Sequence, residues 1–218
     1  MKQTILGAAV LAAGLFLSAC GTAAPAASLP ESGAPAAKAA PSSQERKILI
    51  AYFSLADIVP DGADASTHAT PASGNTEDAA KEIQRQTGGD LFAIRTERKY
   101  PVLHREGSRV AEEEIQSDAR PRLTSEVPHM EEYDTVYIGY PLWWYMEPMA
   151  IRTFIEAYDF RGKTVIPFCT SLGAGVERSA EDIRERLPGA QVLPGVTLPT
   201  GRDHTRAIDQ WLTSIGMK

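Results

Sequence analysis

A dense run of aromatic side chains, between Gly139 and Met146, is the first feature of this sequence that could do chemistry. The run reads Gly-Tyr-Pro-Leu-Trp-Trp-Tyr-Met, and large apolar rings gathered in one loop are costly to leave exposed. A flat aromatic ligand would stack on them. An aromatic cluster that closes the core, or a protein interface, would also account for them. The candidate ligand contacts are Pro141, Leu142, Trp143, Trp144, Tyr145 and Met146.

A short polar segment, Ser73-Gly74-Asn75-Thr76, could hold a phosphate at the start of a helix. Glycine lets the backbone turn tightly. The hydroxyl groups and the free N–H groups of a first helical turn bind phosphate without any Lys or Arg. A plain helix cap, with Thr76 as the N-cap residue, is the alternative interpretation.

A third loop, from Cys169 to Gly175, combines hydroxyl groups with small residues. Such a composition leaves backbone N–H groups open to the edge of a ligand, although a simple glycine-rich turn would look the same. The candidate contacts here are Thr170, Ser171, Leu172, Gly173 and Gly175. We interpret Cys169 itself as a small, buried apolar residue.

The elements that must position these loops alternate between strand and helix along the chain. Continuous apolar runs are typical of strands that are covered on both faces, whereas apolar residues at helical spacing predict amphipathic helices. The predicted strands are 48–53, 91–94, 135–139, 164–168 and 191–197, the last of them broken by Pro194 and Gly195. The first predicted helix opens at 73–76 and ends at Thr87, and the others are 108–119, 148–158, 176–187 and 203–215. Strict alternation predicts an α/β fold with a doubly wound parallel sheet. In such sheets, ligands lie beyond the carboxyl ends of the strands, where the three loops begin.

Composition excludes several classes of function. The chain has 22 Lys and Arg against 28 Asp and Glu, and no cluster of basic residues that would indicate nucleic-acid binding. Two Cys cannot form a disulfide scaffold or a Cys-rich zinc site. None of the four His lies at a metal-ligand spacing.

The first 46 residues indicate export and anchoring rather than folding. Lys2 precedes an apolar stretch, Ile5 to Leu17, which is shorter than the roughly 20 residues needed to span a bilayer. Leu17-Ser18-Ala19-Cys20 resembles the lipobox of bacterial lipoproteins, which predicts a signal peptide over 1–19 and a lipid on Cys20. An ordinary secretory peptide is the alternative. Residues 20–46, rich in Ala and Pro, then form a tether, and the domain over 47–218 is held at the bacterial cell envelope.

Together, the three loops resemble those of the flavodoxin-like family over about 47–218. The carrying segments are Tyr52-Phe53-Ser54, Gly74-Asn75-Thr76, Gly139 to Trp144, and Tyr158-Asp159-Phe160-x-Gly162-Lys163-Thr164 leading into Pro167-Phe168-Cys169-Thr170. They are similar to those of a small branch with a Trp-Trp loop that holds FMN without a covalent bond. The resemblance implies five parallel strands in the order 2-1-3-4-5.

The resemblance also implies a role for each loop. Ser54, Ser73, Gly74, Asn75 and Thr76 would hold the FMN phosphate. Pro141 to Met146 would flank one side of the isoalloxazine ring, with Trp144 rather than Trp143 stacked on it, and Thr170 to Gly175 would line the other side. Residues 55–72 interrupt a loop that is continuous in the family, which leaves the role of Ser54 in question.

These features predict an FMN-binding protein of the cell envelope that transfers electrons or acts as a flavin-dependent oxidoreductase. No side chain need act as acid, base or nucleophile, because the flavin carries the redox chemistry. The expected partner is a redox protein or a quinone, associated with the membrane. A flavodoxin-like lipoprotein that has lost flavin and serves in binding or structure is the alternative.

Overall fold

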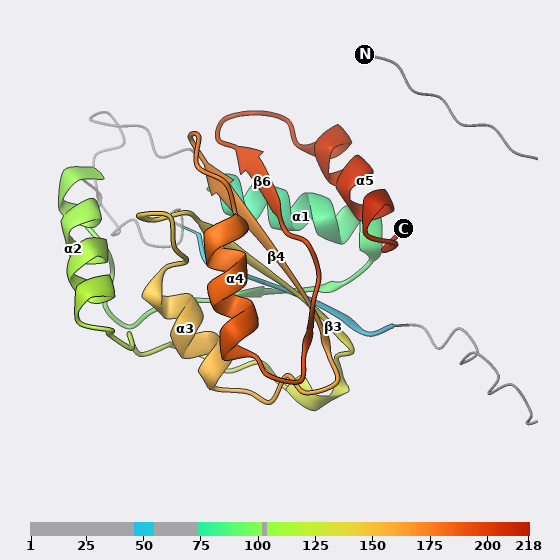
Figure 1. Cartoon of the computed structure of the whole chain (residues 1–218), viewed down its shortest axis with the longest axis horizontal. Coiled ribbons are helices and arrows are strands. Elements are labelled where there is room, and N and C mark those ends of the chain that lie inside the picture. The colour runs from blue at the N-terminus through green and yellow to red at the C-terminus, as the bar shows by residue number, and fades with distance from the viewer. Residues whose placement is uncertain (1–45, 55–73, 102–103) are drawn as a thin grey trace, which may run out of the picture. The chain divides into compact units, whose positions relative to one another are not determined.

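A parallel sheet forms the centre of this chain (Figure 1), in a computed structural model that describes residues 46–54, 74–101 and 104–218. Its strands are β1 (Ile48–Tyr52), β2 (Asp90–Ala93), β3 (Thr135–Pro141), β4 (Thr164–Ser171), β5 (Gln191–Val192) and β6 (Val196–Pro199). The order is β2-β1-β3-β4-β5, with β6 also paired to β4, and every pairing is parallel. The predicted fold class and strand order are therefore confirmed.

Helices cover both faces of the sheet. They are α1 (Asn75–Thr87), α2 (His104–Gln116), α3 (Met149–Glu156), α4 (Glu177–Arg186) and α5 (Thr205–Ser214), with a short 3₁₀ turn at Met130–Glu132. Buried residues of α1 and α5 pack on one face, and those of α2, α3 and α4 pack on the other. Two covered faces explain why β1 is apolar throughout, since Leu49 and Ala51 face one layer while Ile50 and Tyr52 face the other.

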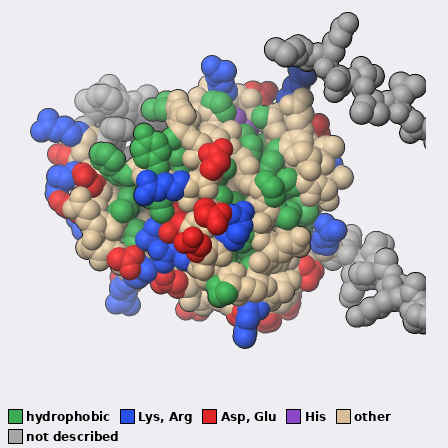
Figure 2. All heavy atoms as spheres, viewed as in Figure 1, with side chains coloured by type: hydrophobic (Ala, Val, Ile, Leu, Met, Phe, Trp, Pro, Cys, Tyr) green, Lys and Arg blue, Asp and Glu red, His purple; other side chains and the backbone are tan. Residues whose placement is uncertain are grey.

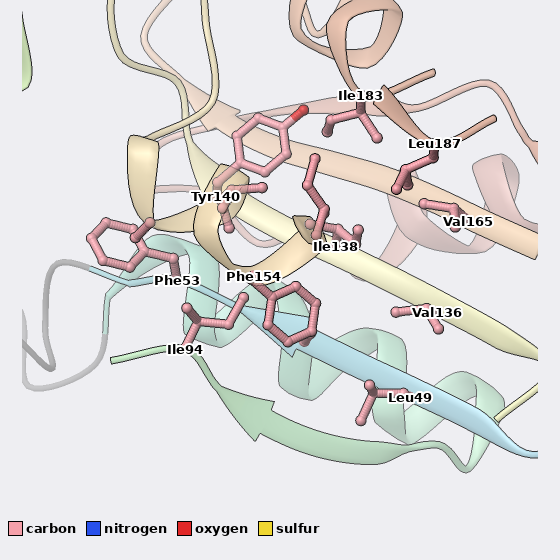
Figure 3. Packing of buried hydrophobic residues seen from close by; sticks show 14 of the residues in the cluster. Leu49, Phe53, Ile94, Val136, Ile138, Tyr140, Phe154, Val165, Ile183 and Leu187 are labelled. Carbon is pink, nitrogen blue, oxygen red and sulfur yellow. The ribbon is translucent and has the colours of Figure 1, made fainter. Parts of the chain in front are cut away.

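The core on the α3 and α4 side is built from branched and aromatic side chains (Figure 3). Val136 and Ile138 of β3 lie between Leu49 of β1 and Val165 of β4, beneath Phe154 of α3. On the opposite face, a Cβ at Gly139 would lie 2.1 Å from the ring of Phe168. Only glycine fits at this point of the central strand, two residues before its end at Pro141.

The last predicted strand, 191–197, is divided into two elements at the predicted break. It divides into β5, which pairs with the start of β4, and β6, which pairs with its end. Pro194 lies in the gap, where its missing N–H costs no ladder bond, and its carbonyl accepts a hydrogen bond from Nε1 of Trp211. Strand β6 therefore extends the sheet beside the carboxyl end of β4, at the edge where the three candidate loops lie.

Helix starts also differ from prediction. Helix α2 begins at His104, four residues before its predicted start, whereas α1 begins at Asn75, within the segment predicted to open it. His204, rather than Asp203, is the residue that precedes α5, although the Asp203 carboxylate accepts the N–H of Thr205. Within the described ranges, no helix is long and apolar enough to cross a membrane. The signal peptide, Cys20 and most of the tether lie outside the described residues, so they stay predictions.

Candidate functional site

The parallel register brings the three candidate loops to one edge of the sheet. Tyr52 of β1 pairs with Gly139 of β3, and Pro141 of β3 pairs with Thr170 of β4. The chain therefore leaves all three strands at nearly the same level, as predicted. Beyond the last ladder pair, the N–H of Leu142 donates to the Thr170 carbonyl at 3.0 Å, which joins the second loop to the third.

The start of α1 is tied to β4 through a hydroxyl pair. Gly74 is the N-cap residue in extended conformation, so the interpretation of Thr76 as a plain N-cap is wrong. The Oγ1 of Thr76 instead lies 2.8 Å from the Oγ1 of Thr170, and both side chains are buried. Either oxygen can donate in that bond, which leaves the hydrogen of the other hydroxyl for a further acceptor.

Other predicted phosphate residues surround this helix start. The first backbone N–H groups of α1 have no partner inside the helix, and they lie at the positive end of its dipole. The Oδ1 of Asn75 accepts the N–H of Gly201 at 2.8 Å, which joins the loop after β6 to this helix start. Ser54 is buried two residues beyond β1. Ser73 lies outside the described residues, as does the 55–72 insertion.

The aromatic loop is a tight hairpin turn with an unusual backbone. Trp143 and Met146 exchange two hydrogen bonds, of 2.9 and 2.8 Å. Between them, Trp144 and Tyr145 have φ angles of 51° and 66°. Two consecutive positive φ angles define a type I′ turn, in which Asn-Gly is preferred. Bulky residues there cost about 1–3 kcal/mol each, so the surrounding contacts must hold this turn in place.

The two tryptophans have different environments. The ring of Trp143 packs edge-on against Phe53 and Tyr100, with centroid distances of 5.5 and 5.1 Å. The core-cluster interpretation therefore describes Trp143. Trp144 is 51% exposed, and its Nε1 donates to the Ser108 carbonyl of α2 at 3.1 Å. Together with Tyr145, which is 61% exposed, Trp144 leaves ring surface available to a flat ligand.

The loop after β4 folds on itself and presents one apolar side chain. The Oγ of Ser171 accepts the N–H groups of Gly173 and Ala174, at 3.2 and 3.0 Å. A Cβ at Gly175 would lie 1.9 Å from the Glu177 carboxylate, whereas Gly173 has open space around it. Leu172 is 91% exposed. Within the described ranges, Trp144, Tyr145 and Leu172 are the large exposed hydrophobic residues, and all three lie at this one edge.

Comparison with known proteins agrees with this geometry. Residues 67–215 match the family model described as flavodoxin. The chain belongs to the flavodoxin family. No curated protein matches it.

Solved structures support the same assignment. The chain is 33% identical to a candidate flavoprotein from Bacteroides eggerthii DSM 20697, with 79% of this chain and 99% of that one covered and a TM-score of 0.62. It is 31% identical to one from Bacteroides uniformis ATCC 8492, with 78% and 99% covered and a TM-score of 0.61. A flavoprotein from Lactobacillus acidophilus NCFM, solved in complex with FMN, is 24% identical, with 76% and 98% covered and a TM-score of 0.57.

The single cysteine of this flavodoxin domain is inert in its surroundings. Cys169 is fully buried, and its Sγ lies 3.8 Å from Oγ1 of Thr197. Burial raises the pKa of its thiol to about 11, so the reactive thiolate is not populated at neutral pH. This environment fits the interpretation of Cys169 as an apolar residue.

A buried ionic cluster behind the aromatic turn is a feature that sequence reasoning missed. Glu147 directly follows the turn, and its side chain is fully buried. Nε of Arg152, in α3, donates to its Oε1 at 2.7 Å. Acidic and basic side chains interleave over α3 and α4 in Figure 2. The sequence carried little signal for this cluster, because Arg152 lies off the apolar face of the 148–158 helix and is buried only by the packing of that helix.

Proposed function

We propose that this flavodoxin binds FMN without a covalent bond at the loop edge of its sheet and transfers electrons through it. The observation that carries the proposal is the exposure of Trp144 and Tyr145 on one loop and Leu172 on the next, beside a helix start that can hold an anion. A flat ring is bound by apolar side chains on its faces, and a phosphate is bound by hydrogen-bond donors. The candidate flavoproteins from Bacteroides and the FMN complex from Lactobacillus support it.

The residues present fit this cofactor. Thr76, Thr170 and the first N–H groups of α1 would bind the phosphate, and Gly74 allows close approach of its backbone. Trp144 and Tyr145 would cover one face of the ring, while Leu172 and Gly173 would line the other. When bound, FMN supplies the redox chemistry, and the chain itself binds the ring, orients it and excludes water from its faces. Both an electron carrier and an FMN-dependent oxidoreductase follow from such a site.

Replacing Trp144 tests the site directly. We expect Trp144→Ala to weaken FMN binding by about 1–3 kcal/mol, the usual value of a lost ring stack. Trp144→Phe should recover most of the affinity, because it keeps a ring while losing the hydrogen bond to Ser108. Titration of FMN against each variant, followed by quenching of flavin fluorescence, gives the three affinities. If Trp144→Phe binds as weakly as Trp144→Ala, the ring does not stack on the flavin.

We further propose that the domain works at the cell envelope, anchored through a lipid on Cys20. The lipobox-like sequence and the Ala/Pro-rich tether support this location. A flexible tether of 26 residues, over 21–46, has an r.m.s. span of roughly 25–30 Å, so the domain could reach a partner in the same membrane. That partner would be a membrane-associated redox protein or a quinone.

Replacing Cys20 tests the anchor and the donor together. We expect the Cys20→Ser variant to leave the membrane fraction and to be reduced much more slowly than the anchored protein when a respiratory substrate is supplied. The flavin absorbance of membranes mixed with each protein measures the rate. Reduction of the released domain at the same rate as the anchored one would mean that the donor is soluble.

A further inference from the structure

The carboxyl group of Glu147 is incompletely bonded although it is fully buried. It lies between Met146, the last residue of the aromatic turn, and Pro148, the N-cap of α3. Its Oε1 accepts from Arg152, but its Oε2 has no hydrogen-bond partner. A buried carboxylate oxygen without a donor is costly. The same oxygen, if protonated, becomes a donor and needs only an acceptor nearby.

The ion pairs around Glu147 leave one negative charge of the cluster without a cation. The guanidinium of Arg152 also contacts Asp118 at 3.2 Å and Asp182 at 3.4 Å, so three carboxyl groups surround this cation, and for Glu147 it is the one cationic partner among the described residues. The whole ionic cluster has four carboxyl groups and three guanidinium groups; they belong to Glu147, Asp118, Asp182, Glu156, Arg152, Arg120 and Arg186. With every group ionised, the cluster keeps one unbalanced negative charge, and its most buried carboxyl is that of Glu147.

We propose that Glu147 is a positioning residue for the FMN site, which holds the aromatic turn in place as a neutral acid that donates a hydrogen bond to the Asp182 carboxylate. One proton makes the cluster neutral, and it gives Oε2 a partner. The turn needs such support, since its two central residues both have positive φ angles. The inference rests on the proposed FMN function for its effect on binding, but not for the proton itself.

The electrostatics of the cluster agree with this assignment. Burial raises the pKa of Glu147 to about 7, against the opposing effect of Arg152 and with a further contribution from Asp182. Burial would also raise the pKa of Asp182, but the hydrogen bond from Arg186, the proposed one from Glu147 and the charge of Arg152 outweigh it and leave that pKa lowered. A proton shared by the pair therefore resides on Glu147 rather than on Asp182, below about pH 7. Tyr140 of β3 also faces the pair, and burial raises its pKa, so it stays neutral.

The sign of the pH dependence follows from linkage. The folded chain holds a proton on Glu147 that the unfolded chain releases near pH 4.5. Stability from this group is complete below that value, falls as pH rises toward 7, and is lost above it. If only the protonated form of Glu147 holds the turn in its binding conformation, the apparent Kd for FMN should be about tenfold higher at pH 8 than well below the pKa of Glu147.

The test compares the full chain with Glu147→Gln and Asp182→Asn from about pH 5.5 to about pH 8. Gln reproduces the neutral acid, because its amide N–H can donate to Asp182 while its oxygen accepts from Arg152. We expect Glu147→Gln to bind FMN at pH 8 as tightly as the wild type does at low pH. Asn at 182 can donate to Oε2 of an ionised Glu147, so Asp182→Asn should also lose the pH dependence. Glu181→Gln, an exposed position on the same helix, should behave as the wild type.

Two readouts separate the possible failures. The FMN phosphate titrates with a pKa near 6 in every variant, and dividing the wild-type Kd by the Kd of Glu147→Gln at the same pH removes that common effect. This ratio should rise about tenfold by pH 8. The melting temperature without FMN should fall with pH in the wild type relative to Glu147→Gln, because that difference cancels His204 and the other groups that both proteins share. That second profile holds even if FMN does not bind. A difference between the two melting profiles that stays constant with pH, or a Glu147→Gln variant that binds FMN more weakly at every pH, overturns the proposal.

Discussion

FMN is expected to bind this chain at least about 100-fold more tightly than riboflavin, which lacks only the phosphate. The start of α1 offers free N–H groups and a positive dipole, and the buried Thr76–Thr170 pair retains one hydroxyl hydrogen. Two charge-assisted hydrogen bonds contribute roughly 3 kcal/mol, which corresponds to about a hundredfold in Kd. Parallel titrations of both ligands, followed by flavin fluorescence, measure the ratio.

A variant of the hydroxyl pair provides the control for that ratio. Thr76→Val keeps the volume of the side chain but removes the hydroxyl that bonds to Thr170. It should lower the affinity for FMN about tenfold, the value of one such bond, and leave that for riboflavin nearly unchanged. Equal affinities of the wild type for FMN and riboflavin would mean that no phosphate site exists at this helix.

Trp143→Ala is expected to lower the free energy of unfolding by about 3 kcal/mol, as is usual for the loss of a packed Trp ring. The ring is part of an aromatic cluster with Phe53 and Tyr100, and truncation would leave a cavity beneath the turn. For a domain of this size, the melting temperature should fall by about 6–12 °C. Thermal unfolding without FMN measures the effect.

The neighbouring position provides a matched comparison. Trp144→Ala removes a ring that is half exposed and bonded only through Ser108 among the described residues, so its melting temperature should change by much less. The two variants should thus separate stability from affinity, with Trp143 affecting mainly the former and Trp144 the latter. If both substitutions lower the melting temperature alike and neither changes FMN affinity, the whole loop is a core cluster.

Local patterns in the sequence were sufficient for the fold class, whereas the strand order was predicted from the resemblance to flavodoxins. Continuous apolar strands, helical spacing and terminators such as Gly88, which caps α1 with a φ of 76°, depend on neighbours a few residues away. The loop edge followed from parallel topology alone, because the carboxyl ends of parallel strands meet at one level. The predicted groups on these loops, from Thr76 to Trp144 and Thr170, could therefore be named without coordinates.

Partners that lie far apart in the chain were decided only by the tertiary structure. Thr76 looks like a cap in the sequence, but its hydroxyl meets Thr170, which is 94 residues away. Nothing local distinguishes Trp143 from Trp144; a hairpin turn with two positive φ angles directs one ring inward and leaves the other half exposed. Glu147 lies among apolar residues with no sequence neighbour to pair with, and its charge state depends on Arg152 and Asp182 on two helices. Periodicity encodes which side chains are buried, whereas their polar partners are set by how the helices pack on the sheet.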